Sequence, residues 1–163
     1  ANFTNIKAHG ETVANGLRIT PNDGETNPGA DFTNAQMNFA SLNDSASTNA
    51  DYKTCIFASA KMYGAVITPA ADACDFSGAD LTKATITEKV EGCDFTGATL
   101  TEITLTHTDI SSLSAKTKFV NAIMKGVTLP ASAVILGADF SGADISGADM
   151  DNATIANNAA SIL

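Results

Sequence analysis

The chain has 163 residues, of which 18 are acidic and 9 basic, so its formal net charge is −9. The length fits one domain, and the negative charge argues against a nucleic-acid-binding protein, which needs a basic surface. Apolar residues make up 44%, but aromatic residues only 6% and Trp is absent, which excludes a conventional core built from large side chains.

The sequence shows neither a membrane-spanning segment nor a signal peptide. No apolar run is long enough to span a membrane, and no basic segment followed by an apolar segment opens the chain. The chain starts at Ala1 without a Met. Together with the richness in Ser, Thr, Asn and Ala, this start favours a mature exported, periplasmic or lumenal form over a cytoplasmic one.

A five-residue repeat organises most of the chain. The repeat is interrupted at residues 6–29 and again at residues 45–54. A period of five belongs neither to an α-helix nor to a continuous strand. In chain order the clearest copies read ANFTN at 1–5, ADFTN-AQMNF-ASLND at 30–44, CDFSG-ADLTK-ATITE at 74–88, CDFTG-ATLTE-ITLTH-TDISS at 93–112 and ADFSG-ADISG-ADMDN-ATIAN at 138–157.

Each five-residue unit predicts one short strand followed by one corner. The first and third residues, such as Ala79 and Leu81, lie two apart, so in an extended segment they face the same side. We expect this side to face the interior, and the second residue, often Asp or Asn, to point outward into solvent. The last two residues, as in Ser77–Gly78, suit a tight turn. A chain of such corners closes into a coil.

Phenylalanine marks a longer period. Units centred on Phe recur at spacings of 25, 19, 19, 24 and 21 residues, close to four units. Units centred on Leu, Met or Ile follow most of them, and then a less regular fourth segment. The sequence predicts a four-sided coil with Phe stacked on one side, where it fixes the register of neighbouring coils. The predicted column consists of Phe32, Phe57, Phe76, Phe95, Phe119 and Phe140.

These units resemble the pentapeptide-repeat family, whose loose pattern is a small residue, Asp or Asn, Leu or Phe, and two polar or turn residues. CDFSG, ADLTK, ADFSG and ADISG fit this pattern. The resemblance implies an all-β fold, a right-handed quadrilateral β-helix, here as a single domain over residues 1–163. The interruptions near 6–29 and 45–54 depart from the family pattern, and we expect them to be irregular loop insertions or a distorted first coil. With about 4.8 Å per coil, about seven coils make a rod on the order of 35 Å long. Such repeats define a fold and say little about function.

Three cysteines share one slot of the repeat. Cys55, Cys74 and Cys93 each precede a predicted column Phe by two residues, at the inward small position. A soft-metal or redox column is one interpretation, and replacement of Ala by another small buried side chain is the other. Stacked thiols without His or carboxylate partners lack the tetrahedral arrangement of a zinc site. We therefore expect these cysteines to serve packing, with no metal and no cofactor.

Acidic residues mark the C-terminal part of the chain. Asp75 and Asp94 are predicted outward neighbours on adjacent coils, but the later Asp residues occupy different sides of one coil and do not converge on a cation. Residues 137–163 contain no basic residue, which suits a basic or mixed-charge partner. The predicted interaction surface consists of Asp139, Asp144, Asp149, Asp151, Ile162 and Leu163.

Two further patterns concern ice binding and catalysis. Thr85–Thr87 and Thr104–Thr106 place paired outward Thr on the third side of adjacent coils, an array similar to ice-binding surfaces, although Thr is also a good strand residue. The histidines, His9 and His107, have no nucleophile placed beside them, and no phosphate-binding loop or CxxC motif is present. We therefore expect no catalytic residues and no enzyme.

The sequence predicts a non-catalytic structural or protein-interaction module. Its partner is another protein or a second copy, bound through the ends of the rod, with no nucleic acid and no membrane insertion. One alternative is an acidic DNA mimic that modulates a type II topoisomerase, as the family resemblance and the net charge of −9 suggest. A minor alternative is an ice-binding solenoid.

Overall fold

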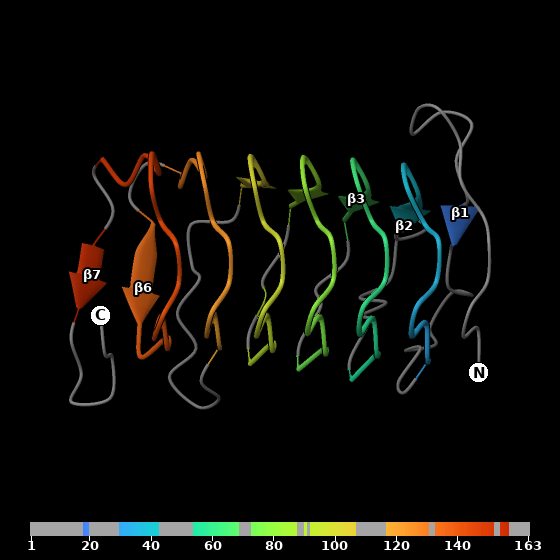
Figure 1. Cartoon of the computed structure of the whole chain (residues 1–163). Coiled ribbons are helices and arrows are strands. Elements are labelled where there is room, and N and C mark those ends of the chain that lie inside the picture. The colour runs from blue at the N-terminus through green and yellow to red at the C-terminus, as the bar shows by residue number, and fades with distance from the viewer. Residues whose placement is uncertain are drawn as a thin grey trace.

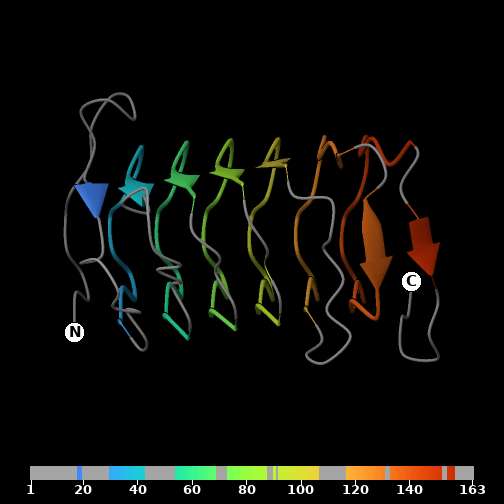
Figure 2. The same cartoon turned by 180° about the vertical axis from the view of Figure 1, so that it is seen from behind.

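The structure, a computed structural model, describes residues 18–19, 30–42, 54–68, 73–87, 90, 92–106, 117–130, 133–151 and 154–156. Within these ranges the backbone forms short strands, single bridges and turns, and no helix. Successive coils lie side by side along one axis, with β1 (Arg18–Ile19) towards one end and β7 (Thr154–Ala156) towards the other (Figure 1, and Figure 2 from behind). The predicted all-β coil is confirmed.

Each coil has four sides, which we call walls 1 to 4 in chain order. Wall 3 holds a parallel sheet in which each strand pairs with the strand of the next coil. Thr85, for example, pairs with Val66 in the preceding coil and with Thr104 in the following one, a step of 19 residues in each direction. The strands in order are β1 (Arg18–Ile19), β2 (Ser41–Leu42), β3 (Val66–Ile67), β4 (Thr85–Ile86) and β5 (Thr104–Leu105).

Single parallel bridges hold walls 1 and 2. They connect the second residue of each five-residue unit, which is the outward position, to its counterpart in the next coil. The wall 1 column is Asp31, Ile56, Asp75, Asp94, Lys118 and Asp139, and the wall 2 column is Gln36, Lys61, Asp80, Thr99, Ile123 and Asp144. On wall 4, the strands that lie in the described residues belong to the last two coils. There β6 (Val134–Leu136) pairs in parallel with β7.

The first predicted interruption contains a strand. Residues 18–19, inside the expected loop insertion at 6–29, form β1 and pair with β2 on wall 3. Part of that segment therefore belongs to a coil. The rest of it, the opening unit at residues 1–5, and the second interruption except Thr54 lie outside the described residues.

The core is the inside of the coil. The six predicted Phe rings form one column, with centroids 4.9–5.2 Å apart and planes within 9° of parallel. Small residues, mostly Ala or Cys, fill the slot two residues before each large one, which lets the backbones of opposite walls approach. The largest fully buried side chains are Phe32, Phe57, Phe76, Phe95, Met37, Leu42, Met62, Ile67, Leu81, Ile86 and Leu100.

The corners require a left-handed backbone. The fifth residue of a unit has a positive φ at every described corner between walls 1 and 2 and between walls 2 and 3. Glycine accepts this conformation freely, as at Gly97 (φ 67°). Other residues at such corners, including Lys83 (φ 58°) and Glu102 (φ 54°), each cost about 1–2 kcal/mol of conformational strain. The ladder hydrogen bonds on both sides hold them there.

Candidate interaction surface

The three cysteines lie in one buried column on wall 1. Cys55, Cys74 and Cys93 are at most 1% exposed, and none forms a disulfide. A hydrogen bond with the Cys74 thiol, together with burial, raises the pKa of Cys55. The bond with Cys55 lowers the pKa of Cys74, but its bond with Cys93 and burial outweigh that effect and raise it overall. Thiols held in their neutral form behave as small apolar side chains.

No metal site accompanies this column. Within the described ranges, no group of three or more His, Cys, Asp or Glu side chains could hold a metal ion. The two histidines, His9 and His107, lie outside those ranges. No described segment is a helix long and apolar enough to cross a bilayer.

A buried threonine continues the cysteine column. Thr117 is 2% exposed and occupies the next inward slot, two residues before Phe119. Its hydroxyl donates to the Val90 carbonyl oxygen at 3.1 Å and accepts from the Gly92 amide at 3.2 Å. It therefore joins wall 1 of one coil to the segment that leads into wall 1 of the preceding coil. Sequence reasoning missed this residue, although a polar side chain at an inward slot was a usable signal.

The outward aspartates form part of the corners. One carboxylate oxygen of each accepts the backbone N–H two residues further on, at 2.8–3.2 Å in the seven described cases. In Asp31 the same oxygen also accepts the Thr33 hydroxyl at 2.7 Å. Such local bonds stabilise turns. The expectation of a merely solvated position was incomplete. The aspartates are Asp31, Asp75, Asp80, Asp94, Asp139, Asp144 and Asp149.

In Asp31, Asp94 and Asp144 such bonds favour the ionised carboxylate. The hydroxyl of Thr33, and then its amide, lower the pKa of Asp31. The side chain and amide of Ser146 do the same for Asp144, with a further contribution from Lys125. For Asp94, burial alone would raise the pKa, but the hydrogen bonds from Lys118 and Thr96 outweigh it and lower the pKa.

A lysine interrupts the acidic column of wall 1. Lys118 Nζ lies 2.7 Å from Asp94 Oδ2, between the coils that carry Asp75 and Asp139. The hydrogen bond to Asp94 is the largest cause that raises the pKa of Lys118. Ile56 breaks the same column nearer its start. Wall 1 therefore presents one adjacent pair of carboxylates, Asp75 and Asp94, and no continuous acidic stripe, and DNA mimicry stays a prediction.

The threonine face of wall 3 is small and uncharged. Thr104 and Thr128 are exposed and Thr85 half-buried on its first column. On its second column the Thr87 and Thr106 hydroxyls donate to backbone oxygens of the preceding coil at 3.4 and 3.3 Å. Two of the hydroxyls are thus turned into the sheet, and ice binding on this face stays a prediction.

The predicted acidic residues surround an open apolar surface on the last described coil. Asp139, Asp144 and Asp149 take the outward position of walls 1, 2 and 3, and we call them, with Asp151, the acidic rim. Asp144 Oδ2 pairs with Lys125 Nζ at 3.2 Å. Ile162 and Leu163, the remaining residues of the predicted surface, lie outside the described residues.

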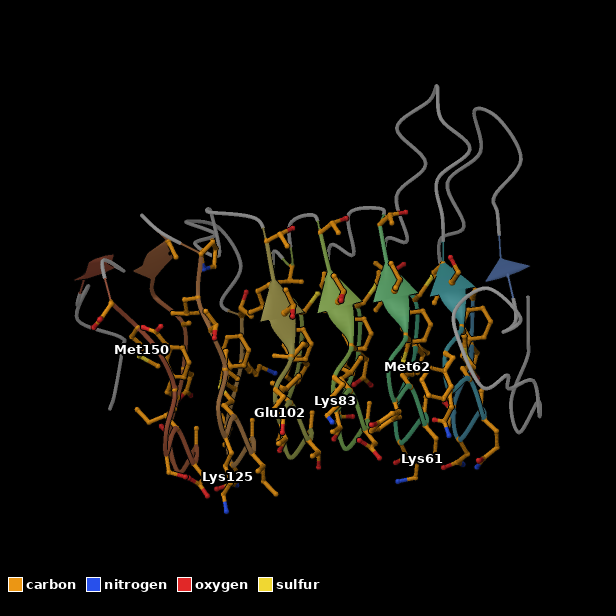
Figure 3. All side chains as sticks on the ribbon, turned by 90° about the horizontal axis from the view of Figure 1, so that it is seen from above. Lys61, Met62, Lys83, Glu102, Lys125 and Met150 are labelled. Atoms are coloured by element: carbon orange, nitrogen blue, oxygen red, sulfur yellow. The ribbon has the colours of Figure 1, made fainter. Side chains whose placement is uncertain are left out.

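The interior positions of that coil are partly exposed. Ile145 is 39% exposed, and Phe140 and Met150 are half-buried, whereas their counterparts in the preceding coil, Phe119 and Met124, are 2% exposed. Met150 lies towards the red end of the rod in Figure 3. We call Phe140, Ile145 and Met150 the open end. The structure thus places acidic side chains around an apolar surface, a combination that binds proteins through both burial and charge.

The fold defines a repeat solenoid, in which each coil contacts its immediate neighbours. The family model described as pentapeptide repeats, eight copies, matches residues 133–156. The same five-residue unit builds walls 1, 2 and 3 from Ala30 to Asp151. The described unit thus matches the pentapeptide-repeat model over that segment, and the fold is the right-handed quadrilateral β-helix.

Solved structures of such repeats align with the chain at low identity. HetL, a protein involved in heterocyst differentiation regulation from Nostoc sp. strain PCC 7120, is 18% identical over 93% of this chain and 86% of its own, with a TM-score of 0.42. A trypsin-treated variant of QnrB1, a plasmid-mediated fluoroquinolone resistance protein, is 23% identical over 89% and 72%, with a TM-score of 0.30. Rfr23 from Cyanothece 51142 is 14% identical over 94% and 86%, with a TM-score of 0.25. No curated protein sequence matches.

Proposed function

We propose that this chain is a non-catalytic interaction module, a β-helical rod that binds a protein partner or a second copy of itself through its ends. The observation that carries the proposal is the open end. On walls 1 and 2 of the preceding described coils, the third residue of each unit donates its N–H to the following coil, as Phe119 does to the Asp139 carbonyl at 2.7 Å. The N–H groups of Phe140, Ile145 and Met150 have no hydrogen-bond partner in the part of the chain that the structure describes.

Unpaired strand edges and apolar exposure favour the same kind of contact. A row of free N–H and C=O groups is a template for pairing with another chain. Burial of the exposed part of Ile145, together with the half-buried Phe140 ring and Met150 thioether, adds a hydrophobic contribution. A contact made in this way needs no catalytic residue.

Sedimentation velocity over a wide concentration range tests the proposal. We expect the wild type to associate, and Ile145→Lys to weaken association about tenfold or more, because a charge on the open end opposes burial of its apolar surface in a contact. Ile123→Lys is the matched control, since Ile123 is 40% exposed but points outward from wall 2. A wild type that stays monomeric at the highest concentration, or equal effects of the two variants, would overturn the proposal.

A further inference from the structure

An aromatic pair lies on the outer corner between walls 2 and 3. The rings of Phe39 and Tyr63 meet edge to face, with centroids 5.5 Å apart and planes at 77°. Both rings are half-buried, so part of each faces solvent. Every other Phe in the described ranges belongs to the interior column. The pair therefore forms an aromatic surface outside the core.

The backbone at Phe39 is unusual for a bulky residue. Its φ is 56°, in the left-handed region, which a large side chain enters at a cost. The same corner position holds Gly64, Gly126 and Gly147 in other coils. Glycine would suit residue 39 equally well for folding. An edge-to-face aromatic contact stabilises by an amount similar to this strain, so the contact with Tyr63 offsets a cost of similar size.

The neighbouring residues leave room for the Phe39 ring and hold Tyr63. A Cβ atom at Gly64 would lie 2.7 Å from Phe39 Cε1, so any side chain there would displace the ring. The Tyr63 N–H donates to Asn38 Oδ1 at 3.1 Å. The aromatic surface is thus held by the coil beneath it and does not depend on a flexible loop.

Two exposed lysines flank the rings. Lys61 lies on wall 2 of the same coil as Tyr63 and has no ion pair with any residue in the described ranges. Lys83 occupies the corner of the next coil, beside the Tyr63 hydroxyl, and pairs with Glu102 at 3.6 Å. Figure 3 shows Lys61 and Lys83 along one long edge of the rod. We call Phe39, Lys61, Tyr63 and Lys83 the aromatic corner.

The open end of the same chain has complementary chemistry. Residues 133–151 contain four Asp and no basic residue. Asp149 is exposed, and neither it nor Asp151 has an ion pair among the described residues. Ile145 and Met150 offer an aliphatic side chain and a thioether, both of which pack well on aromatic rings.

We propose that the aromatic corner binds the open end and acidic rim of a second copy of this chain. The proposal rests on the proposed function and assigns the surface that the open end contacts. Two different surfaces meet, so the contact is heterologous, and repetition of it gives rings or open chains of molecules. Because Lys and Asp side chains attract across the contact, its affinity falls with added salt.

Sedimentation equilibrium of the full chain with two variants tests the aromatic corner. Phe39→Gly removes the ring and relaxes the backbone, and Lys61→Glu reverses an exposed charge, so both variants should fold. We expect each to lower the association constant about tenfold or more. The control combines Thr104→Glu with Thr106→Glu, both exposed on wall 3 and away from the acidic rim; it lowers the net charge by two, as Lys61→Glu does, and should leave association unchanged.

Charge exchange gives the second arm of the test. A variant with Lys61→Glu and Lys83→Glu, and a variant with Asp149→Lys and Asp151→Lys, should each fail to associate alone, whereas their mixture should associate. Association that is lost in Ile145→Lys but unchanged in Phe39→Gly and Lys61→Glu would overturn the aromatic corner and leave the proposed function standing. A monomeric wild type would overturn both, so the two failures are distinguishable.

Discussion

Replacement of Phe76 by alanine lowers the free energy of unfolding by about 3–5 kcal/mol. Phe76 lies in the middle of the phenylalanine column, is fully buried, and stacks on Phe57 at 4.9 Å and on Phe95 at 5.1 Å. Its loss leaves a cavity between the rings of Phe57 and Phe95. Ladder hydrogen bonds fix the backbones of these coils, so the coils move only partly into the cavity. Urea denaturation followed by circular dichroism measures the change.

Phe140→Ala is the matched control for this prediction. Phe140 stacks on Phe119 at 4.9 Å on one side and is half-buried on the last described coil. Less apolar surface leaves water on folding there, so the loss should be clearly smaller than at Phe76. Equal losses at the two positions would show that the column is not the main source of stability.

Acidification below about pH 4 lowers the thermal unfolding temperature by several degrees. Asp31, Asp94 and Asp144 have pKa values below their ordinary range in the folded chain. A carboxyl group with a lowered folded-state pKa stabilises the fold above its unfolded-state pKa, near 3.9, and loses that contribution as the pH falls through the folded-state pKa. Thermal melts between pH 6 and about pH 2.5 measure the effect.

Asparagine provides the control for the acid effect. Asp31→Asn and Asp144→Asn keep a side-chain oxygen that accepts the bond from Thr33 or Ser146, but they do not titrate. The double variant should therefore lose less of its melting temperature between neutral and acid pH than the wild type. A wild-type melting temperature that stays constant or rises on acidification would contradict the role given to these carboxylates.

The period of the sequence was enough to predict a four-sided coil, and the family resemblance added its right hand. An alternation of small and large inward residues every five positions defines strand and corner together, and it is repeated in every coil from Ala30 onward. The Phe spacing locates the coils because one large ring per turn has a single position where it packs. Insertions and deletions fall on wall 4, so the 24-residue step from Phe95 to Phe119 did not disturb the register.

Features that depend on contacts between coils were not predictable from the repeat. The Thr117 hydroxyl bonds to the backbone of Val90 and Gly92, which lie 27 and 25 residues earlier in the chain. The length of the irregular segment before Thr117 sets this separation. The Phe39 corner depends on a glycine 25 residues later, at Gly64. The acidic rim was predicted from the sequence, together with Ile162 and Leu163, whereas the exposure of Ile145 on the open end depends on the packing of the last described coil.

A disulfide cross-link tests the central claim, which is the coil register, most directly. In a background of Cys55→Ala, Cys74→Ala and Cys93→Ala, we place cysteines at Thr85 and Thr104, which pair in register on wall 3. Neighbouring strands lie about 4.7–4.9 Å apart, within the Cα range of a disulfide, so mild oxidation should bridge this pair rapidly. Cysteines at Thr85 and Thr99, on different walls, should not react. Absence of the first bridge, or equal bridging of both pairs, would contradict the account.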